Sequence, residues 1–141
     1  MSSRSRPAQR NIGCFASPRS VAALERYLAN DHVAERREFD ARAEAIRGGV
    51  AMLPGVRAEI FVPEVANHVP HVKISWDAAA KGLSANDAVN ALRAGEPSIG
   101  TRSEGDALVI GVWMMQPGEE KIVARRLRQV LEASAPAARA K

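Results

Sequence analysis

The segment from residue 18 to residue 48 constrains the fold most, because its apolar residues recur at helical spacing over about thirty positions. A single helix of this length would be about 45 Å long, at 1.5 Å per residue. Such a helix is typical of a segment that runs between two domains or packs across a sheet. Ser17 and Pro18 have the residue types of a helix start, and Gly48-Gly49 those of an end. The apolar positions are Val21, Leu24, Leu28, Phe39, Ala43, Ile46 and Val50.

Shorter elements follow this helix. The residues of His71–Trp76 alternate between apolar and polar side chains, as in a half-buried strand. Ser84 and Asp87 have capping-box spacing for a helix that ends at Gly95. The other predicted elements are a strand over 58–62, a hairpin of 98–102 and 107–113 around Ser103-Glu104-Gly105, and a helix that opens at Pro117-Gly118-Glu119-Glu120. A long helix followed by ββαββα predicts an α+β two-layer domain. Its small mixed or antiparallel sheet would be covered by helices on one face.

The charge distribution argues against a nucleic-acid partner. The net charge of +4 comes from the ends: residues 1–20 contribute four arginines without an acid, and residues 134–141 contribute +2, so the remainder is −2. A folded nucleic-acid module is expected to be basic on the domain itself. We therefore predict basic disordered tails over 1–17 and 134–141, around one domain over 18–133. Cys14 is the only cysteine, and no run is apolar enough to cross a membrane, which predicts a cytoplasmic protein without a membrane partner.

Three phrases in sequence order resemble a known enzyme family. They are VPEVANHVPHVKISWD (62–77), ALRAGEPSIGTR (91–102) and MMQPGEEKIVARRLRQVL (114–131). They resemble the small C-terminal domain of fold-type I pyridoxal-phosphate enzymes, in the group of selenocysteine synthase and D-glucosaminate-6-phosphate ammonia-lyase, which is class V aminotransferase-like. The resemblance covers about residues 18–133. It implies lyase or transferase chemistry on amino-acid-like substrates.

The resemblance also implies what a complete enzyme contains beyond these residues. Family members hold the cofactor in a larger domain, with a lysine that bonds it and a cradle for its phosphate. Lys73, Lys81, Lys121 and Lys141 all lie in polar segments, whereas such a lysine works best when it is desolvated. We therefore expect no catalytic and no cofactor-binding residue in this chain, and no activity of the chain alone. Whether the chain acts in an enzyme at all stays open at this point.

Arg102 is the leading candidate for a binding role. Enzymes of this fold often hold the substrate carboxylate with a small-domain arginine, because a guanidinium makes two parallel hydrogen bonds with it. In a complete enzyme His68 and His71 are expected to line the substrate cleft. Their HxxH spacing does not predict a metal site, because no third ligand lies nearby in sequence. The alternative for all three is an ordinary surface or loop role.

Two kinds of partner remain open. A separate chain with the catalytic lysine would complete a pyridoxal-phosphate enzyme. Alternatively, the chain is a non-enzymatic α+β module that forms a homodimer or binds a partner through its strand face or its long helix. An RNA-binding sheet is the weakest reading, because such sheets display stacked aromatic residues and only 4% of this sequence is aromatic.

Overall fold

A computed structural model describes residues 17–65 and 67–134. The chain divides into two compact units, with the division after Glu35, and each is described by itself. The first contains α1 (Pro18–Ala29) and the start of α2 (His32–Ala51). Most of the tails predicted over 1–17 and 134–141 lies outside the described residues.

The segment predicted as one helix is two helices, so the single long helix over 18–48 was wrong. The chain becomes extended at Asn30, which ends α1. The carboxylate of Asp31 then accepts hydrogen bonds from the backbone N–H groups of Val33 and Ala34, at 3.1 and 3.0 Å. Asp31 is therefore the N-cap of a new helix, and not a solvated residue inside a long one. The apolar spacing continues across the break, which explains why periodicity alone missed it.

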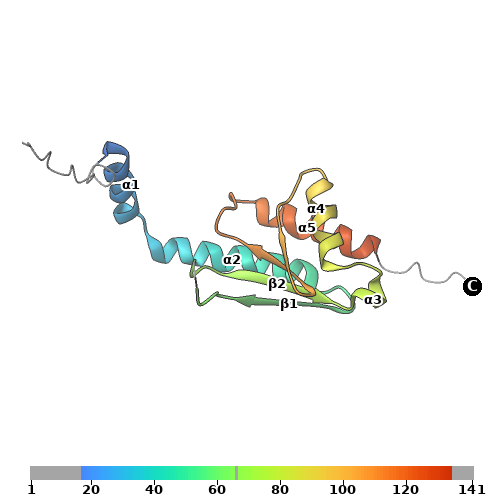
Figure 1. Ribbon diagram of the computed structural model, residues 1–141. Helices are drawn as coiled ribbons and strands as arrows, with labels where there is room; N and C mark the ends of the chain where they lie inside the picture. Colours follow the sequence, from blue (N-terminus) through green and yellow to red (C-terminus); the bar gives the residue numbers. More distant parts are fainter. Residues whose placement is uncertain (1–16, 66, 135–141) are drawn as a thin grey trace, which may run out of the picture. The chain divides into compact units, whose positions relative to one another are not determined.

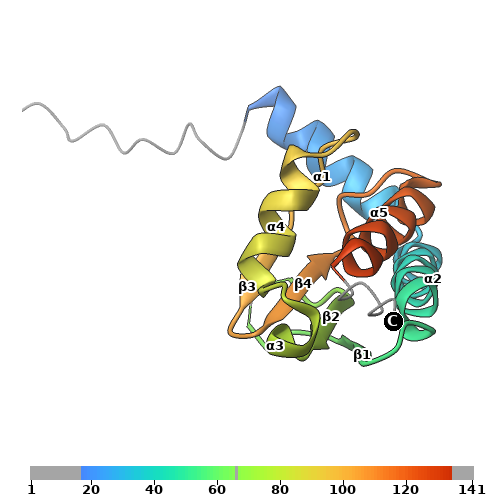
Figure 2. The same cartoon turned by 90° about the vertical axis from the view of Figure 1, so that its right-hand side faces the viewer.

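The second unit contains a four-stranded antiparallel sheet with the strand order β1-β2-β4-β3. Its strands are β1 (Val56–Phe61), β2 (His71–Trp76), β3 (Arg102–Glu104) and β4 (Ala107–Gly111). The helices α2, α4 (Ala85–Ala94) and α5 (Glu119–Ala133) lie on one face of this sheet (Figures 1 and 2), and a single turn, α3 (Ala78–Lys81), follows β2. The predicted α+β class, with helices on one face, is confirmed.

One apolar core lies between the sheet and the helices. Every second residue of β2 is buried in it, as the alternation predicted. From the helical side, the core receives Ile46 of α2, Leu92 of α4 and Leu127 of α5, none of which is more than 1% exposed. The remaining core members are Ala43, Val50, Leu53, Val72, Ile74, Trp76, Ala88, Ile99, Leu108, Ile110, Val112, Val123 and Leu131.

The boundaries of the last hairpin differ from the prediction. The strand expected over 98–102 begins only at Arg102, and the chain turns at Gly105, whose φ of 59° suits glycine. The residues before Arg102 instead connect α4 to the hairpin, and the backbone N–H of Ile99 donates to the carbonyl of Leu92 at 2.9 Å. Ile99 is buried because it packs into the core, and not because it lies in a strand.

We predict opposite effects of alanine at the two neighbouring glycines of α2. Gly48 faces open space, so Gly48→Ala is expected to stabilise the protein by about 0.5–1 kcal/mol through helix propensity. A methyl group at Gly49 would lie 2.8 Å from the Cβ of Ala124 on α5. Overpacking costs about 1–3 kcal/mol, which exceeds the propensity gain, so Gly49→Ala is expected to destabilise. Urea unfolding measures both, and Ala124→Gly should rescue Gly49→Ala; stabilisation by both alanines would contradict the close approach of the two helices.

The capping box of α4 predicts part of the acid sensitivity. The hydroxyl of Ser84 donates to the Asp87 carboxylate at 2.6 Å, and this hydrogen bond, followed by that of the Ser84 backbone N–H, lowers the pKa of Asp87 from its ordinary 3.8. A lowered pKa in the folded state stabilises the protein above pH 3.8, and this contribution is lost as the pH falls through the folded-state pKa. Ser84→Ala should therefore lose less stability than wild type between neutral pH and about pH 3. Equal losses in urea unfolding would contradict this.

Candidate functional site

The sheet face opposite the helices collects polar side chains from three strands, β1, β2 and β3. The register puts Lys73 of β2 directly across from Glu59 of β1 and Val109 of β4, and Val109 across from Arg102 of β3. Residues directly opposite one another in antiparallel strands point to the same face. We call this surface the open face. Its members are Arg57, Glu59, Phe61, His71, Lys73, Ser75, Arg102, Glu104, Ala107, Val109 and Gly111.

Arg102 is at the start of β3, an edge strand, and its side chain is 62% exposed. Its nearest charge partner is Glu104 at 3.9 Å, and that side chain is also more than half exposed. An exposed pair at this distance holds a guanidinium only weakly. Arg102 is therefore free to exchange Glu104 for a carboxylate ligand, which it would meet with two parallel hydrogen bonds.

The two histidines separate in the structure. His71 is on the open face, directly across from Gly111, and its Nδ1 donates to the carbonyl of Val69 at 2.9 Å. His68 is exposed in the preceding loop, where its backbone carbonyl accepts a hydrogen bond from Arg36 at 2.8 Å. The structure therefore brings His71 and Arg102 to one face, with β4 between them, and leaves the His68 side chain outside this set.

An aromatic cluster adjoins His71 at the end of the sheet. The rings of Phe61 and His71 have centroids 5.7 Å apart. A side chain at Gly111 would meet both the His71 Nε2 and the Trp113 ring at 3.3 Å, so glycine is what lets these two rings approach the strand. Trp113 is 45% exposed and Met114 is 71% exposed. Trp113 therefore lies outside the core, whereas Trp76 is buried.

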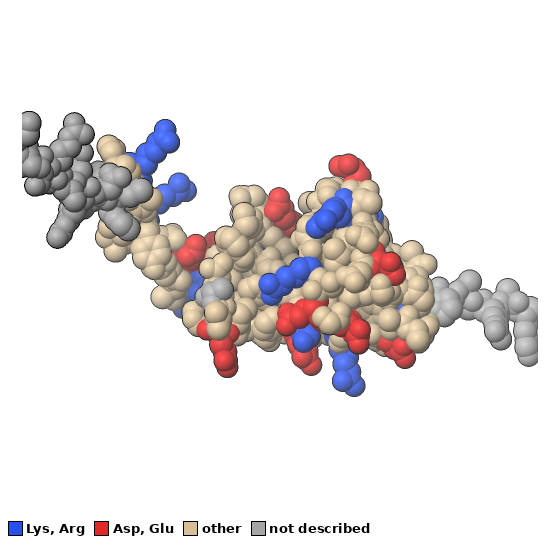
Figure 3. Space-filling view, viewed as in Figure 1, with Lys and Arg blue, Asp and Glu red and all other residues tan. Residues whose placement is uncertain are grey.

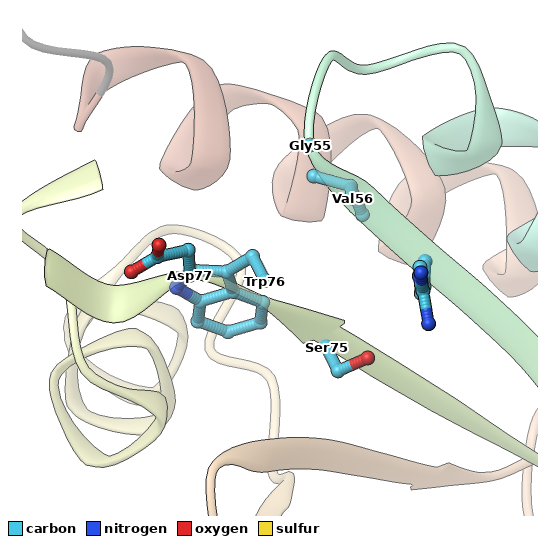
Figure 4. A pocket seen from close by; sticks show the side chains of 6 residues that line it. Gly55, Val56, Ser75, Trp76 and Asp77 are labelled. Carbon is cyan, nitrogen blue, oxygen red and sulfur yellow. The ribbon is translucent and has the colours of Figure 1, made fainter. Parts of the chain in front are cut away.

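A hollow at the end of the β1–β2 pair offers less chemistry. It is formed by residues 55–57 and 75–77, and Figure 4 shows Asp77 and Trp76 at the end of β2 near Val56 of β1. The Asp77 carboxylate accepts hydrogen bonds from the backbone N–H groups of Ala79 and Ala80, at 2.9 and 3.1 Å, and so caps α3. One oxygen of this carboxylate, Oδ1, accepts both cap hydrogen bonds, and Asp77 is the one acid among the residues that line the hollow, so no carboxylate pair for acid–base catalysis is present there.

The described residues do not fit pyridoxal phosphate. Lys73 and Lys81 are only partly buried and Lys121 is exposed, so none has the desolvated setting that a cofactor-bonding lysine needs. At the start of α5, two acids of its first turn, Glu119 and Glu120, lie against the backbone N–H groups just before the helix, and their charges disfavour a phosphate there. Gln116 donates to Glu119 and Gly118 to Glu120, both at 2.9 Å.

Over residues 17–65 and 67–134 the structure favours no metal site, and the face shown in Figure 3 carries no large basic patch. In these ranges no three His, Cys, Asp or Glu side chains come close enough to hold a metal ion. Figure 3 shows acidic and basic side chains interspersed on the face that it presents, without a large basic patch. No helix in the same ranges has both the length and the apolar character needed to cross a bilayer.

The fold and the open face together define a small α+β domain with three cationic side chains, those of Arg57, Lys73 and Arg102, on a sheet surface. This chain matches a solved structure of D-glucosaminate-6-phosphate ammonia-lyase with a TM-score of 0.65 and 26% sequence identity. The match covers 83% of this chain and 31% of that one, so the chain spans about a third of the length of the protein that it matches. No protein-family model matches the sequence, and no curated protein does.

The match confirms a coarse part of the predicted resemblance. It supports a distant relationship to one domain of an enzyme in the group that the sequence resembles. The relationship to selenocysteine synthase and to class V aminotransferases stays a prediction. Sequence reasoning missed that Lys73 lies on the same face as Arg102, with β4 between them, because it treated Lys73 only as a polar strand residue. The strict alternation of His71–Trp76 predicted which face of the strand Lys73 lies on. Only the pairing with β4 shows that Arg102 lies on the same face.

Proposed function

We propose that this chain is the small C-terminal domain of a pyridoxal-phosphate enzyme of the selenocysteine synthase-like group, a lyase or transferase acting on amino-acid-like substrates. The cofactor is then held by a large domain outside residues 17–134, and this domain supplies one wall of the substrate cleft. Arg102 holds the substrate carboxylate, and His71 lines the cleft beside it. The chain alone is expected to be inactive.

The observation that supports this proposal most is the extent of the structural match. It covers 83% of this chain but 31% of the ammonia-lyase, as a domain of a larger enzyme would. Arg102 is exposed on the open face with only a weak partner, and this is the condition for binding a carboxylate. The described lysines lack the desolvated setting that the cofactor requires, which agrees with a cofactor-binding site in another domain.

The exposed apolar side chains of α1 favour a partner. No residue of this helix is buried, although its apolar side chains form a stripe. A stripe of this kind is expected to be covered in the working protein. We propose a large-domain chain with the catalytic lysine as the partner. The stripe contains Val21, Leu24, Tyr27 and Leu28, which are 48–72% exposed.

A non-enzymatic homodimer is the second candidate, and the same stripe favours it. Two copies could bury their α1 stripes against each other and require no large domain. Sedimentation of the full chain distinguishes the two. A concentration-dependent dimer that Leu24→Glu dissociates supports the homodimer, whereas a monomer supports the large-domain partner. Arg26→Glu on the same helix is the matched control for the charge change.

A chimera tests the enzymatic proposal. Residues 17–134 of this chain replace the matched 31% of D-glucosaminate-6-phosphate ammonia-lyase, and ammonia release from D-glucosaminate 6-phosphate is measured. We expect the chimera to bind the cofactor and to retain measurable activity. The control is the ammonia-lyase truncated at the same position. A folded chimera that binds the cofactor but releases no more ammonia than this control would contradict the proposal.

A further inference from the structure

We propose that Lys73 and Arg102 form a two-cation site on the open face, which binds substrates that carry both a carboxylate and a phosphate ester. This inference rests on the proposed function and deepens it. Arg102 would hold the carboxylate, and Lys73 would be the residue that selects a phosphorylated substrate.

The strand register places the two cations on either side of one residue. Lys73 is directly across from Val109, and Val109 is directly across from Arg102. Neighbouring strands lie about 4.8 Å apart, so the two Cα atoms are about 10 Å apart. A ligand whose two anionic ends are several bonds apart can meet both cations at once.

The burial of Val109 indicates how the two side chains lie. Val109 is 1% exposed, yet it is not part of the core cluster between sheet and helices. The register makes Lys73 and Arg102 its direct cross-strand neighbours on the open face. Long basic side chains cover apolar neighbours with their aliphatic stems and keep the charged ends in water. We infer that both charged ends lie over the same part of the sheet.

The acids of the open face compete for these cations but do not neutralise them. Glu59 is directly across from Lys73, but within residues 17–65 and 67–134 no ion pair of 4 Å or less joins Lys73 to an acid. Arg102 has Glu104 at 3.9 Å, and both side chains are exposed. With Arg57, the face has three cations against two acids. A phosphate ester carries a charge of about −1.5 to −2 at neutral pH, so it competes well against a single carboxylate.

Two ligands that differ only in the phosphate test the inference. 6-Phospho-D-gluconate and D-gluconate are titrated into the full chain at low salt, and binding is followed by NMR. We expect 6-phospho-D-gluconate to bind about tenfold more tightly, which corresponds to about 1.4 kcal/mol, with shifts centred on β2, β3 and β4. Equal binding of the two ligands, or no binding of either at tens of millimolar, would overturn the inference.

Single substitutions separate the two roles. Lys73→Ala is expected to reduce the preference for the phosphate from about tenfold to less than about twofold, and Glu59→Gln to increase it. Arg102→Ala should weaken both ligands. Lys121→Ala, an exposed lysine on α5, is the control and should change neither. If Lys73→Ala keeps the preference for 6-phospho-D-gluconate over D-gluconate, the two-cation inference is wrong but the proposed function still stands. If Arg102→Ala leaves the affinity for D-gluconate unchanged, the result counts against the proposed function.

Discussion

In the chimera with the ammonia-lyase, Arg102→Ala is expected to lower kcat/KM about 100-fold, or about 2.7 kcal/mol of transition-state stabilisation. The reason is that two charge-assisted hydrogen bonds to the substrate carboxylate are lost. Arg102→Lys keeps the charge but cannot form the parallel pair, so an intermediate loss of about tenfold is expected. Initial rates of ammonia release over a range of substrate concentrations give these values.

The matched control is Arg125→Ala, which removes an exposed arginine from α5. It should leave kcat/KM within about twofold of the parent chimera. Cofactor absorbance confirms that each variant is folded. If Arg102→Ala retains full activity in a folded chimera, then Arg102 does not hold the substrate carboxylate.

Arg42→Ala is expected to destabilise the second unit by about 2–3 kcal/mol. The Arg42 side chain is only 11% exposed, and its Nη1 donates to the backbone carbonyl of Met115 at 2.7 Å. It also pairs with Glu38 at 3.3 Å and lies 5.8 Å from the centre of the Phe39 ring. A hydrogen bond from a charged donor contributes about 1.5–3 kcal/mol, and its loss leaves the carbonyl without its partner.

Urea unfolding measures this effect, and two variants identify its source. Arg42→Met keeps the apolar stem, so a loss close to that of alanine would assign the effect to the hydrogen bonds. Arg47→Ala is the control, because Arg47 pairs with Glu44 on an exposed surface and should cost less than about 0.5 kcal/mol. A loss below 1 kcal/mol in Arg42→Ala would mean that the link from α2 to the segment before α5 contributes little.

Local signals predicted most of the fold well. The alternation of His71–Trp76 predicted the strand with its bounds, and Ser84 with Asp87 predicted the start of α4. The helix break at Asn30 was missed because the Asp31 cap interrupts the backbone without interrupting the apolar period. The strand over 98–102 was wrong because Ile99 is buried by tertiary packing, which a short apolar pattern cannot distinguish from a strand.

The sequence alone could suggest only some residues of the candidate site. Arg102 was proposed through a family resemblance, and His71 was proposed together with His68 as a closely spaced pair; both stay predictions. Lys73 required knowledge of strand order, since β2 pairs with β4 and not with β3. His68 and His71 were predicted together because they are close in sequence, but the two residues between them carry the chain from a loop into a strand. Lys73 and Arg102 are far apart in sequence, and only the pairing of their strands with β4 brings them to one face, so no local sequence pattern could predict this.

The proposed function requires that another domain hold the cofactor. The most direct test is to incubate the full chain with pyridoxal phosphate, reduce with borohydride and map any adduct to individual lysines. We predict sparse, sub-stoichiometric labelling without preference among the four lysines, because Lys73, Lys81 and Lys121 all lack a desolvated setting. A stoichiometric adduct at one lysine would contradict the account.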